Sequence, residues 1–444
     1  MEIKPSRHKK GQQIMAKSIV AITKGTDPEK MVEEALSHLG GVTSLIKPNS
    51  TVIVKPNAGH AFPPGTSVNT SPEMVSAVVK TIQKAGPKQI ILTEAASIGS
   101  DTLECLEVSG IGKAAEEAGV DKIIDVKREK DLIQIPIRDA ISDLRLVLLP
   151  RFLIEADHIV NVPIFKSHVS MVFSCALKNI KGVVQDKVHH QMHQTNLAAA
   201  VLDLWSVVRA DLTISDMIRP GEGFGPHSTS PVDFGCVVAG RDPVAVDATI
   251  CRMVGLDVDG VSYFGAARER MMGNDDEKNI EIRGKKIADV FKKLWLPYLA
   301  GLDSWTEYEF HAEGACSSCQ GLLAYTMEML KAKGEYDKNA GMSLVVGRKK
   351  ELPKGLKTGR DCVFIGDCLK KYRGEGLFAG GCPPAEPFIL YTIMDRKDYA
   401  TAEQGEAARH RYENDVRIFQ KYTDENQKKH GTDTGVKKNI KRKS

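Results

Sequence analysis

Four cysteines in the last third of the chain have the spacing expected of a metal site. Cys316 and Cys319 form a Cys-x-x-Cys pair in EGACSSCQGLL, Cys368 follows the run VFIGD, and Cys382 begins CPPAEP. Thiolates bind soft metals, and a helix N-terminus favours the negative charge of a thiolate or of a thiolate-bound cluster. Four such thiols fit either a [4Fe-4S] cluster or a tetrahedral structural zinc.

The spacing of these cysteines favours the cluster. Structural zinc sites commonly combine two close pairs of ligands, whereas this chain has one such pair and two isolated cysteines. The segment GGCPPAEP also resembles the cluster-binding segment in the small subunits of respiratory quinone reductases. Cys362 is excluded, because it opens the strand that ends before Cys368 and six extended residues span roughly 20 Å. Structural zinc and the absence of any metal are the alternatives.

A second group of polar residues lies in NVPIFKSHVSMVFSCALKNIKGVVQDKVHHQMHQ. We interpret Lys166, His168, Lys178 and His193 as candidate catalytic residues. A lysine beside other cations can have a lowered pKa and act as a base or nucleophile, and a basic cluster can bind an anionic substrate or cofactor. His189 and His193 are four residues apart and share one face of a helix, which suits metal or anion contact. A solvated helix face is the alternative for the histidines.

The cysteines and the basic residues can form sites only if helices and strands bring them together. The sequence predicts an α/β fold. Between residues 18 and 260, helical patterns alternate with the short strand-like runs SIVAIT, TVIVKPN, QIILTEA, KIIDV, LVLLP, HIVNVP, LTISD and FGCVVAG. This alternation predicts a mainly parallel sheet with helices on both faces. Ligands of such sheets lie beyond the carboxyl ends of the strands.

Polar and glycine residues at those strand ends are the cofactor-binding candidates: Lys55, Asn57, Glu94, Gly223 and Gly225. The two glycines belong to the loop RPGEGFGPH, where a permissive backbone can approach a ligand closely. The loop matches neither a dinucleotide-binding fingerprint nor a P-loop, so a surface turn is its alternative.

The patterns divide the chain into six parts. We expect a flexible N-terminal segment at 1–17, a larger α/β domain at 18–260, a connector with an amphipathic helix at 261–312, a smaller α/β cysteine-cluster domain at 313–395, a charged helix at 396–427 and a basic disordered tail at 428–444.

Composition excludes several classes of protein. The 444 residues are 42% hydrophobic and 27% charged, which is typical of a globular protein, and no apolar run approaches the roughly 18 to 20 residues that cross a bilayer. The net charge of +4 comes from the tail, where seven Lys or Arg residues and one Asp contribute +6. We therefore expect a cytoplasmic protein without a nucleic-acid or membrane partner.

The motifs VKPN, SPEMVSAVV, EADHIVNVPIFKSH, ALKNIKGVV, ISDMI, GFGP and DPVAVDA together resemble the domain of unknown function 362 family. The likeness covers residues 45–260 and is most specific at 157–182. It implies an iron–sulfur protein, because members frequently carry clusters, often in a ferredoxin-type module. This chain departs from that module, since it lacks the run C-x-x-C-x-x-C-x-x-x-C-P.

A further likeness concerns the order of His168, Lys178 and His193, which is similar to that in nickel-pincer lactate racemases. The likeness implies a lysine that holds the cofactor and histidines that serve metal and proton transfer. The glycine-rich context of that motif is replaced here by ALKNIKG.

These observations predict an iron–sulfur protein with a redox or electron-transfer function. A [4Fe-4S] cluster in the smaller domain would exchange electrons with a site for a small anionic substrate or cofactor on the larger domain. One alternative is a non-redox metal-binding or scaffold protein with structural zinc, and another is a pincer-type racemase or isomerase. The sequence specifies neither the substrate nor the electron donor or acceptor.

Overall fold

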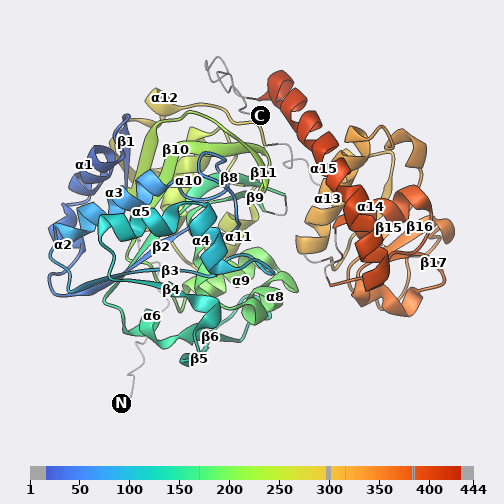
Figure 1. Ribbon diagram of the computed structural model, residues 1–444, viewed down its shortest axis with the longest axis horizontal. Coiled ribbons are helices and arrows are strands. Elements are labelled where there is room, and N and C mark those ends of the chain that lie inside the picture. Colours follow the sequence, from blue (N-terminus) through green and yellow to red (C-terminus); the bar gives the residue numbers. More distant parts are fainter. Residues whose placement is uncertain are drawn as a thin grey trace.

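The computed structural model describes residues 17–169, 171–296, 302–315, 317–382, 384 and 386–431. The predicted N-terminal segment up to residue 16, Cys316 and residues 432–444 of the predicted tail lie outside the described residues. Figure 1 shows two sheet-containing bodies, one formed by the first two thirds of the chain and a smaller one formed by the last third.

The larger body is built on an 11-stranded sheet within the described residues. Its main path runs in the order β13 (Ile280–Gly284), β1 (Ser18–Lys24), β12 (Cys236–Gly240), β10 (Leu212–Phe224), β7 (His158–Val162), β2 (Thr51–Pro56), β3 (Gln89–Glu94) and β4 (Lys122–Asp125). β12 is antiparallel to β1 and β10, and the other pairs on this path are parallel. The predicted α/β fold with a mainly parallel sheet is confirmed.

Helices cover both faces of this sheet (Figure 1). One face packs against α1 (Pro28–His38), α3 (Pro72–Gln83) and α5 (Ile111–Ala118), and the other against α9 (Leu197–Trp205), α10 (Pro243–Met253) and α11 (Ser262–Glu269). Successive side chains of a strand point to opposite faces, so Ala21 lies in one core and its neighbours Val20 and Ile22 in the other. Burial on both faces explains the unbroken apolar runs of these strands.

Two expectations for the larger body were wrong. The run LVLLP forms β6 (Leu146–Pro150), which leaves the main sheet and pairs with β5 (Leu132–Pro136) as a separate antiparallel hairpin. The predicted connector at 261–312 instead contributes α11 and β13, and β13 extends the main sheet beside β1.

In the described part of the amphipathic helix expected in that connector, the helical residues form α12 (Ile287–Val290), and residues 297–301 lie outside the described residues. The backbone then leaves the helix, because Lys292 N and Leu294 N donate to carbonyl oxygens at the end of α10, at 3.0 and 3.1 Å. Leu294 and Leu296 are buried against the larger core. Long-range packing therefore overrides the local helical pattern.

The smaller body contains a four-stranded parallel sheet in the order β14 (Glu309–His311), β15 (Ser343–Val346), β16 (Gly359–Ile365) and β17 (Gly376–Ala379). One face of this sheet packs against α13 (Ser317–Ala332), α14 (Glu386–Asp395) and α15 (Ala402–His430). A second α/β unit is therefore present, as predicted. The helix expected at 396–427 is α15, which begins later, at Ala402, and continues to His430, so residues 428–430 of the predicted disordered tail are helical.

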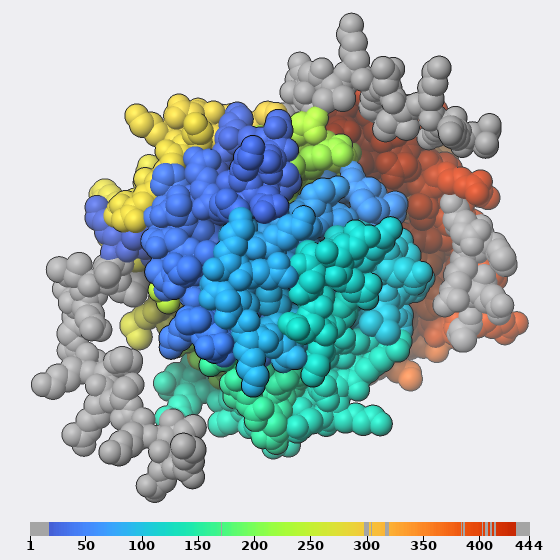
Figure 2. Space-filling model, turned by 60° about the vertical axis from the view of Figure 1, so that its left-hand side comes forward, coloured from blue at the N-terminus to red at the C-terminus, as the bar shows by residue number. Residues whose placement is uncertain are grey.

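The end of α15 contacts the larger body. The ring of Phe224, at the end of β10, lies 5.4 Å from that of Phe419 and 6.0 Å from that of Tyr422. Figure 2 shows the face formed by the N-terminal part of the chain, in blue and teal, with C-terminal residues in red behind its edge. Among the described residues, no helix has the length and apolar character needed to cross a membrane.

Candidate functional site

A pocket of about 280 Å³ lies in the larger body, beyond the carboxyl ends of β2, β3 and β8 (Ile164–His168). We call it the polar pocket. Seven predicted site residues line it: Lys55, Asn57, Glu94, Lys166, His168, Lys178 and His193. Their catalytic or binding roles stay predictions, but the structure brings them together, as expected for side chains at the carboxyl ends of neighbouring parallel strands.

A buried ion pair forms the base of the polar pocket. Lys55 Nζ donates to both Glu94 carboxylate oxygens, at 2.9 and 2.8 Å, and to Asn179 Oδ1 at 3.2 Å. Glu94 also accepts from the backbone N–H of Ala58 and Ala95. Burial lowers the pKa of Lys55 and raises that of Glu94, and their mutual attraction opposes both shifts. The pair is therefore a desolvated charge pair held by further hydrogen bonds.

Gly182 explains part of the motif ALKNIKG. A Cβ atom at this position would lie 1.6 Å from Glu94 Oε1 and 2.5 Å from Lys55 Nζ. Its carbonyl oxygen accepts from Ala95 N at 2.8 Å, so the backbone passes directly over the ion pair. No side chain fits there without displacing the carboxylate.

Two further lysines line the polar pocket, and their amines have different hydrogen-bond partners. Lys166 Nζ donates to Asn57 Oδ1 at 2.8 Å and to the carbonyl oxygen of Val68. Lys178 lines the same pocket, and its amine has no hydrogen-bond or ion-pair partner among the described residues. Burial and neighbouring lysines lower the pKa of Lys166 to about 7 and that of Lys178 to about 8.

Lys178 is held by a short helix, α7 (Ala176–Asn179), whose start is fixed by Asp247 of α10. The two carboxylate oxygens of Asp247 accept from Ala176 N at 2.8 Å and Leu177 N at 2.9 Å. Burial raises the pKa of Asp247 to about 7. Asp247 thus positions the helix that bears Lys178 and does not itself line the pocket.

Helix α8 (Asp186–His193) supplies His189 and His193, which share a face as the spacing predicted. His189 Nε2 donates to the carbonyl oxygen of Lys181 at 2.6 Å, and Lys181 Nζ lies 2.6 Å from His193 Nε2. Burial, followed by the charges of nearby lysines, lowers the pKa of His168, His189 and His193 well below the ordinary value. Without a bound anion, these imidazoles are therefore neutral at neutral pH.

Sequence reasoning missed two histidines of the polar pocket. His227 Nε2 lies 2.9 Å from His60 Nε2, which also lies 3.0 Å from Ser97 Oγ. Burial is the largest cause that lowers the pKa of both histidines, that of His227 to about 4. Each residue shortly follows a predicted element or loop, His60 after TVIVKPN and His227 after GFGP. The position of each histidine just after one of these runs was the available sequence signal for the pocket. The sequence separation of His60 and His227 does not indicate that the two side chains meet.

Gly223 and Gly225 were expected to approach a ligand and do not line the polar pocket. They lie at the end of β10, which continues beyond LTISD to Phe224. A Cβ at Gly225 would lie 2.0 Å from Ser167 O, and Gly223 N donates to Trp295 O at 2.9 Å. The glycines therefore permit close packing within the protein, and the following Pro226 and His227 line the pocket instead.

A second pocket, of about 300 Å³, contains the cysteines of the smaller body. We call it the cysteine pocket. Cys319, Cys368 and Cys382 line it, and Cys319 is buried whereas the other two are exposed. A Cβ atom built at Gly366 would lie 3.6 Å from Cys368 Sγ and 3.8 Å from Cys319 Sγ. Three of the four predicted metal ligands thus line one pocket, and Cys316 lies outside the described residues.

Glycines follow the four strands of the smaller sheet and also line the cysteine pocket: Gly314, Gly347, Gly366 and Gly381. Their φ angles are 73°, 96°, 94° and 124°, which side-chain-bearing residues rarely adopt. At the end of each of the four strands the chain therefore turns at a glycine, and these glycines line the same pocket. Glycines at these strand ends leave space beside the cysteines that side chains would otherwise fill.

Cys362 lies away from this pocket. It is buried in β16 within a separate core cluster that includes Phe364 and Phe378. Burial raises its pKa to about 12, which keeps the thiol protonated. Among the described residues, no group of three or more His, Cys, Asp or Glu side chains is arranged to hold a metal ion.

The two pockets are adjacent through α8. His193 lines the polar pocket, and the next residue, Gln194, lines the cysteine pocket. Gln194 Nε2 lies 3.9 Å from Cys382 Sγ. One helix end therefore contacts both pockets.

Comparisons with known proteins find similarity in the larger body. The family model "Domain of unknown function (DUF362)" matches residues 52–252. A thylakoid-associated protein of Synechocystis sp. is 28% identical over 253 residues, which are 53% of this chain and 72% of that protein.

Two solved structures are similar at lower identity. A crystal structure of a protein from Thermotoga maritima is 17% identical, with a TM-score of 0.29, over 44% of this chain and about half (51%) of that protein's length. The lactate racemase apoprotein from Thermoanaerobacterium thermosaccharolyticum is 10% identical over 90% of this chain and 91% of that chain, with a TM-score of 0.39. The polar pocket lies entirely within residues 52–252, the part of the chain that is similar to the family model.

Proposed function

We propose that this chain is an iron–sulfur redox protein that binds a small anionic substrate or cofactor in the polar pocket. In this proposal Cys316, Cys319, Cys368 and Cys382 hold a [4Fe-4S] cluster. The observation that carries it is that the three described cysteines and four strand-end glycines line the same pocket. When bound, the cluster would supply one-electron transfer.

The donor set of the cysteine pocket supports the cluster. Thiolates are the ligands of cubane clusters, and the exposure of Cys368 and Cys382 leaves their sulfurs accessible for assembly. The remaining lining is largely backbone, which leaves room beside the sulfurs for a group larger than a single ion. Structural zinc is the alternative for the same thiols.

The charge of the polar pocket supports an anionic ligand. Four lysines and five histidines line it, against the single carboxylate of Glu94, which is already paired with Lys55. Lys178 is the amine without a partner among the described residues, so we assign it to the negative group of the ligand. Lys166 would hold a proton at Nζ, and the neutral imidazole of His193 would accept one.

The contact between the pockets supports a single function for both. Because His193 and Gln194 are consecutive, a ligand in the polar pocket would lie close to a group in the cysteine pocket. Electron transfer between the two requires such proximity, whereas a structural zinc does not.

The first test is anaerobic purification of the full chain, followed by an absorption spectrum and by iron, zinc and sulfide analysis. About four irons and four sulfides per chain, with absorbance near 400 nm that bleaches on reduction, would support the proposal. One zinc without sulfide would replace it with the non-redox alternative, in which the smaller body is a structural metal domain.

A second candidate function rests on Lys178 and the histidines beside it. Its pKa of about 8 and its place in one pocket with His168 and His193 suit covalent attachment of an anionic cofactor to its amine. This is the arrangement that a pincer-type racemase or isomerase would use. Intact mass spectrometry after expression with cofactor-maturation enzymes tests it, because a mass equal to that of the bare chain excludes the attachment.

We also propose a cytoplasmic location. The composition and the absence of a membrane-crossing helix among the described residues support it. Cell fractionation tests it, and recovery of the protein with membranes at high salt would contradict it.

A further inference from the structure

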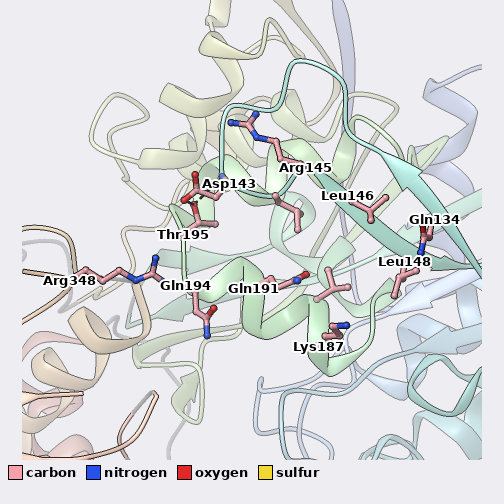
Figure 3. Close-up of a pocket in the computed structure, with 12 residues that line it drawn as sticks. Gln134, Asp143, Arg145, Leu146, Leu148, Lys187, Gln191, Gln194, Thr195 and Arg348 are labelled. Carbon is pink, nitrogen blue, oxygen red and sulfur yellow. Dashed lines mark hydrogen bonds between the residues drawn. The ribbon is translucent and has the colours of Figure 1, made fainter. Parts of the chain in front are cut away.

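A third cavity, of about 440 Å³, lies where the two bodies meet. We call it the interbody cleft. Its walls are α8, the β5–β6 hairpin with the loop before β6, and Arg348, which follows β15 of the smaller body. Figure 3 shows Arg348 reaching from the smaller body toward Gln194, with Gln191 and Lys187 further along the same helix.

The interbody cleft is distinct from the polar pocket. Helix α8 turns His189 and His193 toward the polar pocket, whereas Lys187, Gln191 and Gln194 line the cleft. The cleft and the cysteine pocket share Gln194 and Arg348. A molecule in the cleft would therefore lie beside the cysteine pocket without entering the polar pocket.

Three cations from three separate segments line this cleft: Arg145, Lys187 and Arg348. Lys187 and Arg348 are exposed, and their side chains have no hydrogen-bond or ion-pair partner among the described residues. Asp143 is the acidic residue of the lining, and its carboxylate accepts from Thr195 Oγ1 at 3.3 Å. The cleft thus offers positive charge that the described protein does not neutralise.

Apolar side chains lie between these cations. Leu144 and Val188 are buried beneath the cleft, and Leu146 and Leu148 extend from β6 toward it. Leu146 is 43% exposed, so its side chain is accessible to a ligand in the cleft. A flat, partly apolar body fits this surface, while the amides of Gln191 and Gln194 offer donors and acceptors to a heterocycle.

We propose that the interbody cleft binds a phosphate-bearing redox nucleotide of the flavin or nicotinamide class. Guanidinium and ammonium groups at Arg348 and Lys187 would receive the phosphates, and the ring system would lie on Leu146 and Leu148. A volume of 440 Å³ falls in the range of about 300 to 1,000 Å³ that is usual for such sites. The redox identity of the ligand rests on the proposed function, whereas its binding does not.

The test is a titration of the full chain with FMN, NADH and NADPH, with inorganic phosphate as a further probe. Arg348→Glu and Lys187→Glu each reverse one cation of the cleft, and Arg209→Glu and Lys88→Glu reverse exposed cations elsewhere. Leu146→Ser has a matched control in Ile154→Ser, since the two side chains are 43% and 41% exposed.

We expect at least one nucleotide to bind, and the affinity to fall tenfold or more in both cleft charge variants but not in their controls. Leu146→Ser should weaken the nucleotide and leave phosphate unaffected, because only the nucleotide has a ring to place on the leucines. Binding by none of the three nucleotides would overturn the inference. So would a loss of binding in Lys178→Ala that Arg348→Glu does not share, because the ligand would then occupy the polar pocket.

Repeating the titration on Cys368→Ser separates this inference from the proposed function. Retained nucleotide binding in a variant that has lost iron would uphold the cleft and leave the cluster to its own test. An iron-containing wild-type chain that binds no nucleotide would uphold the cluster and refute the cleft.

Discussion

His193 and Gln194 are consecutive residues that face two different pockets. His193 lines the polar pocket with Lys178, and Gln194 places its amide nitrogen 3.9 Å from Cys382 Sγ. The end of α8 therefore connects the larger body to the smaller, cysteine-bearing body.

Substitution can distinguish the cysteines proposed to bind the cluster from Cys362. Cys368→Ser and Cys382→Ser should each lower bound iron and the absorbance near 400 nm to a small fraction of the wild-type value, because each removes one thiolate ligand. Cys362→Ser is the matched control, since Cys362 lies in a separate core cluster. Loss of iron in Cys362→Ser with retention in Cys368→Ser would show that the ligand set is wrong.

Anion binding to the polar pocket should weaken as pH rises. A bound anion stabilises the protonated amines, so the pKa values of Lys166 and Lys178 rise on binding from about 7 and about 8, and protons are taken up. Affinity for sulfate should be nearly constant below pH 7 and fall as pH increases through 8, by up to about tenfold per pH unit for each amine. Isothermal titration calorimetry in buffers of different ionisation enthalpy measures both the affinity and the proton uptake.

Lys178→Met provides the control for that measurement. It should lower the number of protons taken up and flatten the dependence of sulfate affinity on pH. A pH profile identical to that of the wild type would show that Lys178 does not contact the anion.

Lys178 should react selectively with small amine-directed reagents. A pKa of about 8 leaves far more neutral amine at pH 7.5 than the ordinary lysine value of about 10.4. Limited acetylation followed by peptide mass spectrometry should modify Lys178 ahead of the exposed Lys88, and sulfate should protect it. Equal modification of the two lysines would refute the lowered pKa.

Removing one partner of the Lys55–Glu94 pair should lower the free energy of unfolding more than replacing both partners by apolar residues. Glu94→Gln leaves the Lys55 ammonium buried without its counter-charge, and we expect the free energy of unfolding to fall by about 3–5 kcal/mol. The double variant Lys55→Met with Glu94→Leu should lose less, because no charge is left unpaired. Urea unfolding followed by circular dichroism measures both.

An exposed ion pair provides the comparison. Lys84→Met, which breaks the contact with Glu33 on the protein surface, should leave the unfolding curve unchanged. A double variant as unstable as Glu94→Gln would show that packing around these side chains, and not the unpaired charge, sets the cost.

Much of the polar pocket could be predicted because its residues follow strands. Lys55, Glu94 and Lys166 each lie at or near the end of an apolar run, and parallel strands bring such ends to one edge of the sheet. The four-residue spacing of His189 and His193 likewise predicts that both lie on one face of a helix. These features depend on local periodicity, which the order of residues contains.

The sequence by itself determined the α/β alternation, the strand ends that carry polar residues and the separation of Cys362 from the other cysteines of the smaller body. Only the tertiary structure decided that His60 meets His227, that Ile280–Gly284 joins the main sheet and that Gly225 packs against Ser167. It also decided that Gln194 reaches Cys382. The physical reason is that local pattern fixes which face of an element a side chain occupies, whereas the choice of partner depends on long-range packing of surfaces far apart in the chain.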